Sequence, residues 1–223
     1  MKNSSDIEIS LRTLVNIFPG QVISLSSDQE PMVHVFHAPN SICSQKVRAV
    51  LTAMNQPYIS HEMNIFQGDT YHPEYVRLRA KACQAAGLAL SKHHSGSTSV
   101  KGTGCDACVV PTVIDLRTQE ILIDSQRICL ELVDRNGNCK NTLIPDAHSQ
   151  DILQELDIID ELPNYQILAT TIDSKKGVTD PTRNGFAMSK VQRCDALIKE
   201  HADDECLASA YRSKREKELY AAN

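Results

Sequence analysis

The stretch Asn40-Ser41-Ile42-Cys43-Ser44-Gln45-Lys46-Val47-Arg48 decides the fold. An apolar run at residues 33–37 precedes it and predicts a β-strand, and the apolar residues behind it recur at helical spacing. We therefore interpret it as a strand-to-helix turn with a hydroxyl and a thiol at the start of the helix. Free N–H groups and the positive end of the helix dipole lie there, and they can lower a thiol pKa from ~8.5 to roughly 3.5–7.5. We expect Ser41 to be the N-cap and Cys43 to be a reactive thiolate.

The segments that follow this turn predict a βαβ unit and a hairpin. The helix runs over about residues 41–55, and the alternating residues 58–65 predict a second strand, parallel to the first through a right-handed crossover. A short helix is expected at residues 73–78. Strands at residues 109–115 and 120–123 form an antiparallel hairpin, after which Asp124 and Ser125 cap a helix that ends near residue 135.

The rest of the chain gives weaker patterns. Residues 1–30 predict an extension with one amphipathic helix, which we expect to be a loosely packed arm. Residues 80–108 include a Ser/Gly-rich part and predict a flexible insertion into the domain of residues 31–144. A linker at residues 141–145 leads to residues 145–223, where helices are predicted at 151–162, 188–201 and 203–219.

Composition narrows the functional classes. The chain has 223 residues, 41% of them hydrophobic, a net charge of −5 and only 4% aromatic residues, with no Trp. No basic block stands out, so we expect neither nucleic acids nor anionic membranes as partners. No run of about 18 apolar residues predicts a membrane span. Eight irregularly spaced cysteines do not suit a small disulfide scaffold, and we expect a cytoplasmic protein.

Three motifs together resemble the glutathione transferase superfamily. They are Ser41-Ile42-Cys43-Ser44, Val110-Pro111-Thr112 and Asp124-Ser125, in the order in which that family builds its glutathione site. The Ser-x-Cys turn followed by Lys46 is most similar to the zeta-like reductive dehalogenases. The resemblance implies an α/β thioredoxin-like N-terminal domain (βαβ-α-ββα) followed by an all-α C-terminal domain. Relative to the family the helical part, which supplies the pocket for the second substrate there, looks incomplete.

The same resemblance implies how glutathione would bind as a co-substrate. Ser125 would hold the γ-glutamyl carboxylate at a helix N-terminus, and Asp124 would pair with the glutamyl ammonium or only help to cap the helix. Pro111 would be cis and would turn the Val110 backbone outward to pair with the cysteinyl part of glutathione. The plainer alternatives are an ordinary N-cap and a trans proline at the start of an edge strand.

In the dehalogenases that the turn resembles, a cysteine attacks a glutathionyl-hydroquinone conjugate at sulfur. The hydroquinone leaves, and a second glutathione clears the mixed disulfide. The resemblance gives this role to Cys43, while Ser41 would hold the first glutathione thiolate by a hydrogen bond. The alternative for Cys43 is a small apolar filler of the core.

The resemblance assigns no role to a CxxC pair, Cys105-Asp106-Ala107-Cys108. Two unrelated loop cysteines are the first interpretation, a labile disulfide the second, and a zinc site with His93 and His94 the third. No role is assigned to the three histidines in predicted strands, namely His34, His37 and His61.

The function expected from the resemblance is enzymatic: glutathione-dependent reductive dehalogenation of a halogenated hydroquinone or a similar electrophilic aromatic. One alternative is a glutathione-binding redox module that lacks a competent electrophile pocket. Another is a zeta-like isomerase, because the Ser-x-Cys turn is shared with those enzymes. Apolar faces left on the helical part would favour a homodimer. No metal cofactor is predicted.

Overall fold

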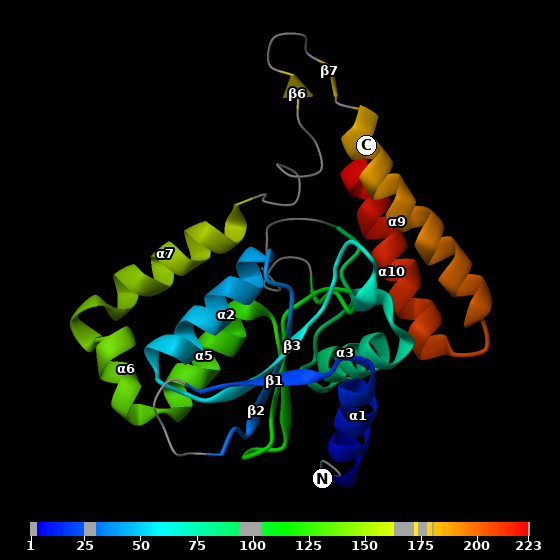
Figure 1. Ribbon diagram of the computed structural model, residues 1–223. Coiled ribbons are helices and arrows are strands. Elements are labelled where there is room, and N and C mark those ends of the chain that lie inside the picture. Colours follow the sequence, from blue (N-terminus) through cyan, green and yellow to red (C-terminus); the bar gives the residue numbers. More distant parts are fainter. Residues whose placement is uncertain are drawn as a thin grey trace.

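The computed structural model describes residues 4–24, 30–93, 104–162, 172–173, 178–179 and 181–222, so His94 lies outside the described residues. A mixed sheet of five strands forms its centre (Figure 1), with the order β1-β3-β2-β4-β5. The strands are β1 (Gly20–Ile23), β2 (Val33–His37), β3 (Tyr58–Glu62), β4 (Thr112–Asp115) and β5 (Glu120–Ile123).

The predicted βαβ unit and hairpin are both confirmed. Strands β2 and β3 are parallel and joined by α2 (Ile42–Ala53), whereas β4 is antiparallel to β2 and to β5. The register pairs Phe36 with Thr112, and Thr112 with Ile123. The carboxyl end of β2, the start of β4 and the start of α5 (Ser125–Arg135) therefore meet at one edge of the sheet. The predicted fold class, a thioredoxin-like domain followed by helices, is confirmed.

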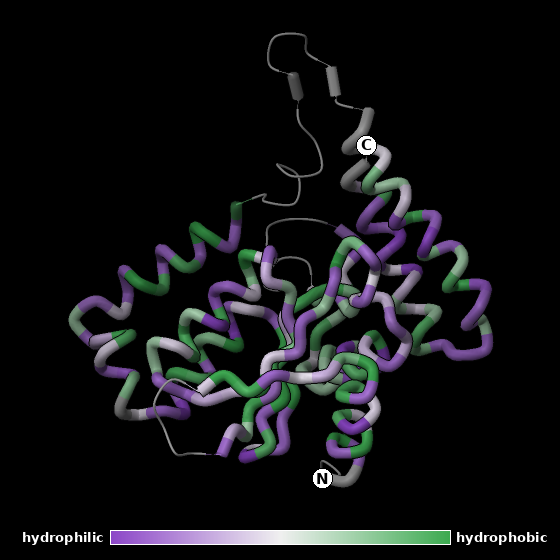
Figure 2. Tube along the Cα trace, in the orientation of Figure 1, coloured by the Kyte–Doolittle hydropathy of each residue, from purple (hydrophilic) through white to green (hydrophobic). Residues whose placement is uncertain are grey.

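Helices cover both faces of the sheet. Helices α2 and α5 pack on the face formed by Val33 and Val35, and α1 (Ser4–Ile17) and α3 (Pro73–Ala85) pack on the face formed by Phe36 and Ile114. Figure 2 shows apolar and polar residues mixed along the strands between these two layers. Alternate strand residues point to opposite faces, so each strand contributes to two apolar clusters.

The N-terminal segment is not the loosely packed arm that we expected. Leu14 of α1 is fully buried, Leu11 and Phe18 are nearly so, and β1 pairs with β3 along its whole length. His61 fixes the connection, because its Nδ1 lies 2.7 Å from the carbonyl oxygen of Phe18. The extension therefore completes the core of the domain.

The start of the expected insertion is also corrected. Helix α3 continues to Ala85, and residues 104–108 are packed against the body of the protein. Cys105 forms a disulfide with Cys83 of α3, so a disulfide within the CxxC pair is ruled out in this structure. The Asp106 carboxylate accepts hydrogen bonds from Lys214 at 2.9 Å and from Lys217 at 3.1 Å.

The helices that follow α5 form two groups on opposite sides of the sheet. The predicted linker is partly helical, as α6 (Gly137–Leu143), and α7 (Ser149–Glu161) follows the 3₁₀ turn η2 (Asp146–His148). Figure 1 shows α6 and α7 beside α2 and α5, and α9 (Pro181–Glu200) and α10 (Glu205–Ala222) at the other side of the sheet, where α10 packs on α3. In the sequence, β6 (Ile172–Asp173) and β7 (Val178–Thr179) lie between α7 and α9 and form a separate two-stranded sheet. No helix of the described residues has both the length and the apolar character to cross a membrane.

Candidate active site

The first turn of α2 begins where the sequence predicted it. Ser41 is the N-cap, with φ −87° and ψ 121°, and its Oγ accepts a hydrogen bond from the Ser44 N–H at 3.3 Å. The Ser44 Oγ in turn accepts from the Ala38 N–H at 3.3 Å, which ties the start of the helix to the end of β2. Since the bond with Ser44 uses Ser41 as an acceptor, the hydroxyl hydrogen of Ser41 can still be donated.

Cys43 lies in this turn, but it is not the exposed thiolate that we expected. The residue is only 8% exposed, and burial raises the pKa of its thiol from the ordinary value. Lys46, one helical turn further on, and the neighbouring Ser125 hydroxyl act in the opposite direction and lower that pKa. Desolvation therefore outweighs the favourable position at the helix N-terminus.

A third helix reaches this site. Asp160 of α7 pairs with the Nζ of Lys46, and the Gln126 Nε2 of α5 donates to the Asp157 Oδ1 of α7 at 2.7 Å. The carboxylate of Asp160, like that of Asp124, raises the pKa of Cys43. Sequence reasoning missed Asp160, because no local pattern connects a residue on α7 with a lysine 114 positions earlier.

Asp124 and Ser125 stand at the N-terminus of α5 as predicted. Asp124 is the N-cap, has a positive φ of 69°, and its Oδ1 accepts from the Arg127 N–H at 3.1 Å. Its other oxygen, Oδ2, is buried and has no hydrogen-bond partner among the described residues. Burial raises the pKa of Asp124 to about 6. A buried carboxylate oxygen without a donor fits the ammonium of a ligand, which would lower that pKa.

The Val110–Pro111 bond is cis, which confirms the expectation from the resemblance. Two side chains of α3 hold the loop at this bond. The Tyr75 hydroxyl donates to the Val109 carbonyl at 2.9 Å, and the buried Arg79 Nη1 donates to the Pro111 carbonyl at 2.6 Å. The spacing of Tyr75 and Arg79, one helical turn apart, was a local signal that the sequence analysis did not use.

The predicted residues therefore converge in part. Cys43, Asp124 and Ser125 lie together, because both Asp124 and Ser125 act on the pKa of the thiol. Ser41 caps the same helix, and the Val110–Pro111 bond leads into β4 at the same edge of the sheet. No group of three or more Cys, His, Asp and Glu residues within the described ranges is arranged to hold a metal ion.

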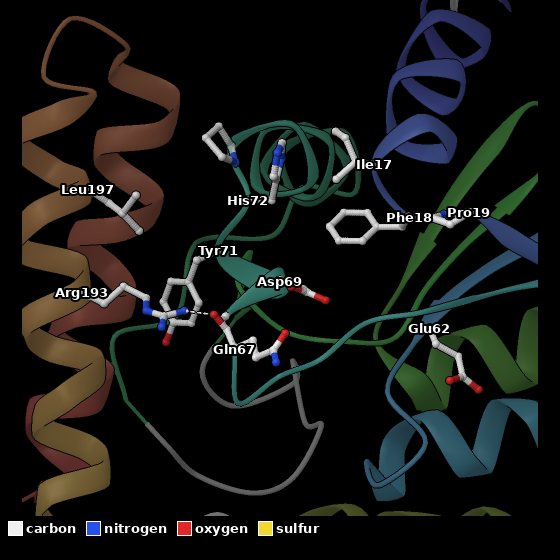
Figure 3. Close-up of a pocket in the computed structure, with 12 residues that line it drawn as sticks. Ile17, Phe18, Pro19, Glu62, Gln67, Asp69, Tyr71, His72, Arg193 and Leu197 are labelled. Carbon is white, nitrogen blue, oxygen red and sulfur yellow. Dashed lines mark hydrogen bonds between the residues drawn. The ribbon is translucent and has the colours of Figure 1, made fainter.

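A cavity among the described residues lies elsewhere. It has a volume of about 600 Å³ and is lined by residues of the α1–β1 connection, the loop before α3, and α9 (Figure 3). Arg193 of α9 reaches across it and donates to the Gln67 carbonyl at 2.8 Å, as Figure 3 shows. Gly68 has a φ of 92°, and a side chain there would overlap the Arg193 guanidinium. None of the predicted site residues lines this cavity.

The sheet order, the parallel βαβ unit and the cis proline ahead of β4 define a thioredoxin-like domain with a cysteine at the start of its first βαβ helix. Comparison with known proteins adds a particular relationship. The chain is 32% identical over 199 residues to the 2,5-dichlorohydroquinone reductive dechlorinases of two strains of Sphingobium indicum. The match takes in 87% of this chain and 57% of the relatives, so the chain spans a little over half of their length.

The chain was also compared with protein-family models and with solved structures. No protein-family model matches the chain. A solved structure of the glutathione transferase URE2P8 from Phanerochaete chrysosporium with oxidized glutathione aligns with a TM-score of 0.40 and 10% identity, over 87% of this chain and 82% of the other. The sequence match confirms the predicted resemblance to reductive dehalogenases, and the chain is a homologue of the curated dechlorinases over the aligned residues.

Proposed function

We propose that the protein is a glutathione-dependent enzyme that reductively dehalogenates a halogenated hydroquinone or a similar aromatic. The observation that carries this proposal is the meeting of Cys43 with the N-terminus of α5, where Ser125 and the partnerless Asp124 Oδ2 lie. The homology to reductive dechlorinases supports the choice of reaction.

Glutathione would bind along the edge that these residues form. The N–H groups at the start of α5 and the Ser125 hydroxyl suit the γ-glutamyl carboxylate, and Asp124 suits the adjacent ammonium. The Val110 backbone, placed by the cis bond, suits the cysteinyl amide. The Ser41 hydroxyl would donate to the glutathione thiolate, since its bond with Ser44 uses it only as an acceptor.

The chemistry balances over two glutathione molecules. The first displaces halide from the keto tautomer of the ring, loses its thiol proton and forms an aryl thioether. The Cys43 thiolate then attacks the sulfur of that thioether, so an S–S bond forms, the aryl C–S bond breaks, and the ring carbon takes up a proton. A second glutathione thiolate attacks the mixed disulfide, releases Cys43 and leaves as glutathione disulfide. The ring carbon gains two electrons, and the two thiols supply them.

The proposal is tested by incubating the purified protein with glutathione and a chlorinated hydroquinone. We expect chloride and glutathione disulfide to appear in equal amounts, and the Cys43→Ser variant to accumulate the glutathionyl conjugate instead of the reduced ring. Absence of chloride release above a control without protein would contradict the proposal.

One observation favours a second candidate, a glutathione-binding module without turnover. Cys43 is buried and the pKa of its thiol is raised, whereas an attacking thiol needs access and a thiolate. In that case the protein would be retained on immobilised glutathione and would release no chloride. Retention together with chloride release would exclude the module.

A further inference from the structure

Helix α7 brings acidic side chains to the N-termini of α2 and α5. Asp157 and Asp160 are three residues apart and so share one face of α7. Asp157 accepts from Gln126 of α5, and Asp160 pairs with Lys46 of α2. The Asp160 side chain is 2% exposed and that of Lys46 is 17% exposed, so this ion pair is largely shielded from water.

Lys46 also faces the thiol of Cys43. The two residues are three positions apart on α2, and the ammonium of Lys46 favours the thiolate form of Cys43. Asp160 disfavours the Cys43 thiolate in two ways. Its carboxylate neutralises the Lys46 ammonium, and its negative charge repels a second anion nearby. The other titratable groups that face the thiol are Asp124, ahead of α5, and Cys129 within α5.

We propose that Asp160 is a positioning residue that sets the nucleophilicity of Cys43 by holding Lys46, so that docked α7 keeps the thiol unreactive. The inference rests on the proposed role of Cys43 as the nucleophile. Displacement of the end of α7 would remove a carboxylate from the thiol and release the Lys46 ammonium to it. The same residue would thereby link the position of α7 to the activity of the site.

The test is the rate at which iodoacetamide alkylates Cys43, measured from about pH 7 to about pH 10 by mass spectrometry of the Cys43 peptide. Alkylation forms a C–S bond from the thiolate and expels iodide, so its pH profile reports the thiolate fraction. For Asp160→Asn we expect the midpoint to move to lower pH, with a rate at pH 7 raised ~10-fold for each pKa unit of that shift. The plateau at high pH should stay unchanged.

Three control variants separate charge from docking. Asp160→Glu keeps the charge and should retain the wild-type midpoint. Asp151→Asn removes an exposed carboxylate of the same helix and should have no effect. Asp157→Ala removes the contact with Gln126 but leaves the Lys46 pair, so its midpoint should shift less than that of Asp160→Asn.

An unchanged midpoint in Asp160→Asn would overturn the inference, as would an equal shift in Asp157→Ala or a rate increase that is the same at every pH. Alkylation needs neither glutathione nor an aromatic substrate. A shifted midpoint in a protein that releases no chloride would therefore uphold the role of Asp160 and remove only the proposed function.

Discussion

Individual residues decide the chemistry of this edge, and burial decides how each of them titrates. Cys43 has the helix N-terminus, Lys46 and Ser125 in favour of its thiolate, yet desolvation raises the pKa of the thiol. Asp124 shows the same effect, with a pKa raised to about 6. The ammonium of a ligand would stabilise the ionised form of Asp124 and lower its pKa.

Replacement of Ser125 by Ala should weaken glutathione binding. The hydroxyl would donate to a carboxylate, and loss of a hydrogen bond to a charged group costs about 1.5–3 kcal/mol, or roughly a 10- to 150-fold rise in Kd. Titration calorimetry with glutathione measures the change. Ser189→Ala, at an exposed position of α9, is the matched control and should bind as the wild type does. Equal affinity of the Ser125 and Ser189 variants would refute the assignment.

The buried histidines predict a loss of stability in mild acid. Burial lowers the pKa of both His34 and His37 from 6.5 to about 4, and that of His61 is lowered as well. Below the unfolded pKa the unfolded chain binds more protons than the folded one. The histidines therefore cost no stability above pH 6.5, and the protein loses stability as the pH falls from there toward 4.

The His37→Gln variant isolates this effect, since an amide can bond to Ser60 as the His37 Nε2 does at 2.7 Å. Urea unfolding at neutral pH and at about pH 5 should show a smaller decrease of the midpoint in the variant than in the wild type. Parallel decreases in the two proteins would show that His37 does not contribute.

At the scale of elements, α1 is part of the core. Leu14 is fully buried within the cluster that includes Phe36 and Tyr75. We expect Leu14→Ala to lower the free energy of unfolding by about 2–5 kcal/mol, because it leaves a cavity in that cluster. Ile9→Ala, at a position of the same helix that is 63% exposed, should change it by less than about 0.5 kcal/mol. Urea unfolding measures the change for both variants. Similar small effects of the two substitutions would show that α1 is a loosely packed arm after all.

Sequence reasoning succeeded where signals are local. The spacing of apolar residues and the capping residues Ser41 and Asp124 placed α2 and α5 within a residue or two, and the strands at 33–37 and 120–123 were predicted with their observed bounds. It stopped α3 too early at residue 78, although the Ala- and Lys-containing residues that follow favour a helix. The packing of α1 depends on partners distant in sequence, and no local pattern reveals it.

The features of the candidate site also divide into those that local sequence signals predicted and those that depend on the whole fold. The cis bond and the two caps followed from motifs, but the burial of Cys43 did not, because solvent access depends on the whole fold. The contact of Asp160 with Lys46 joins residues 114 positions apart. Charge at a helix N-terminus could be predicted from the sequence, whereas the desolvation that opposes it could not.

At the scale of the whole molecule, a buried ion network joins the CxxC segment to α10. Asp106 lies between Lys214 and Lys217, and Lys214 also pairs with Glu218 at 2.9 Å. These neighbouring lysines hold the pKa of Asp106 well below its usual range despite burial. The network anchors the α9–α10 pair to the thioredoxin-like domain beside α3.

Removal of one partner should therefore destabilise the molecule. Lys214→Met leaves Asp106 and Glu218 buried with less compensation, and we expect a loss of about 3–5 kcal/mol in the free energy of unfolding. Arg212→Met breaks only an exposed pair with Glu205 on the same helix and should cost less than about 1 kcal/mol. Urea unfolding compares the two variants, and losses of the same size would show that the network is not an anchor.

The central claim, that Cys43 takes a glutathionyl group from an aryl thioether, is tested most directly in a single turnover. The protein is mixed with a glutathionyl-hydroquinone conjugate in the absence of free glutathione, and the Cys43 peptide is analysed by mass spectrometry. The account predicts one glutathionyl group on Cys43 for each hydroquinone released, and its removal when glutathione is added. Hydroquinone release without an adduct on Cys43, or undiminished release by the Cys43→Ser variant, would contradict it.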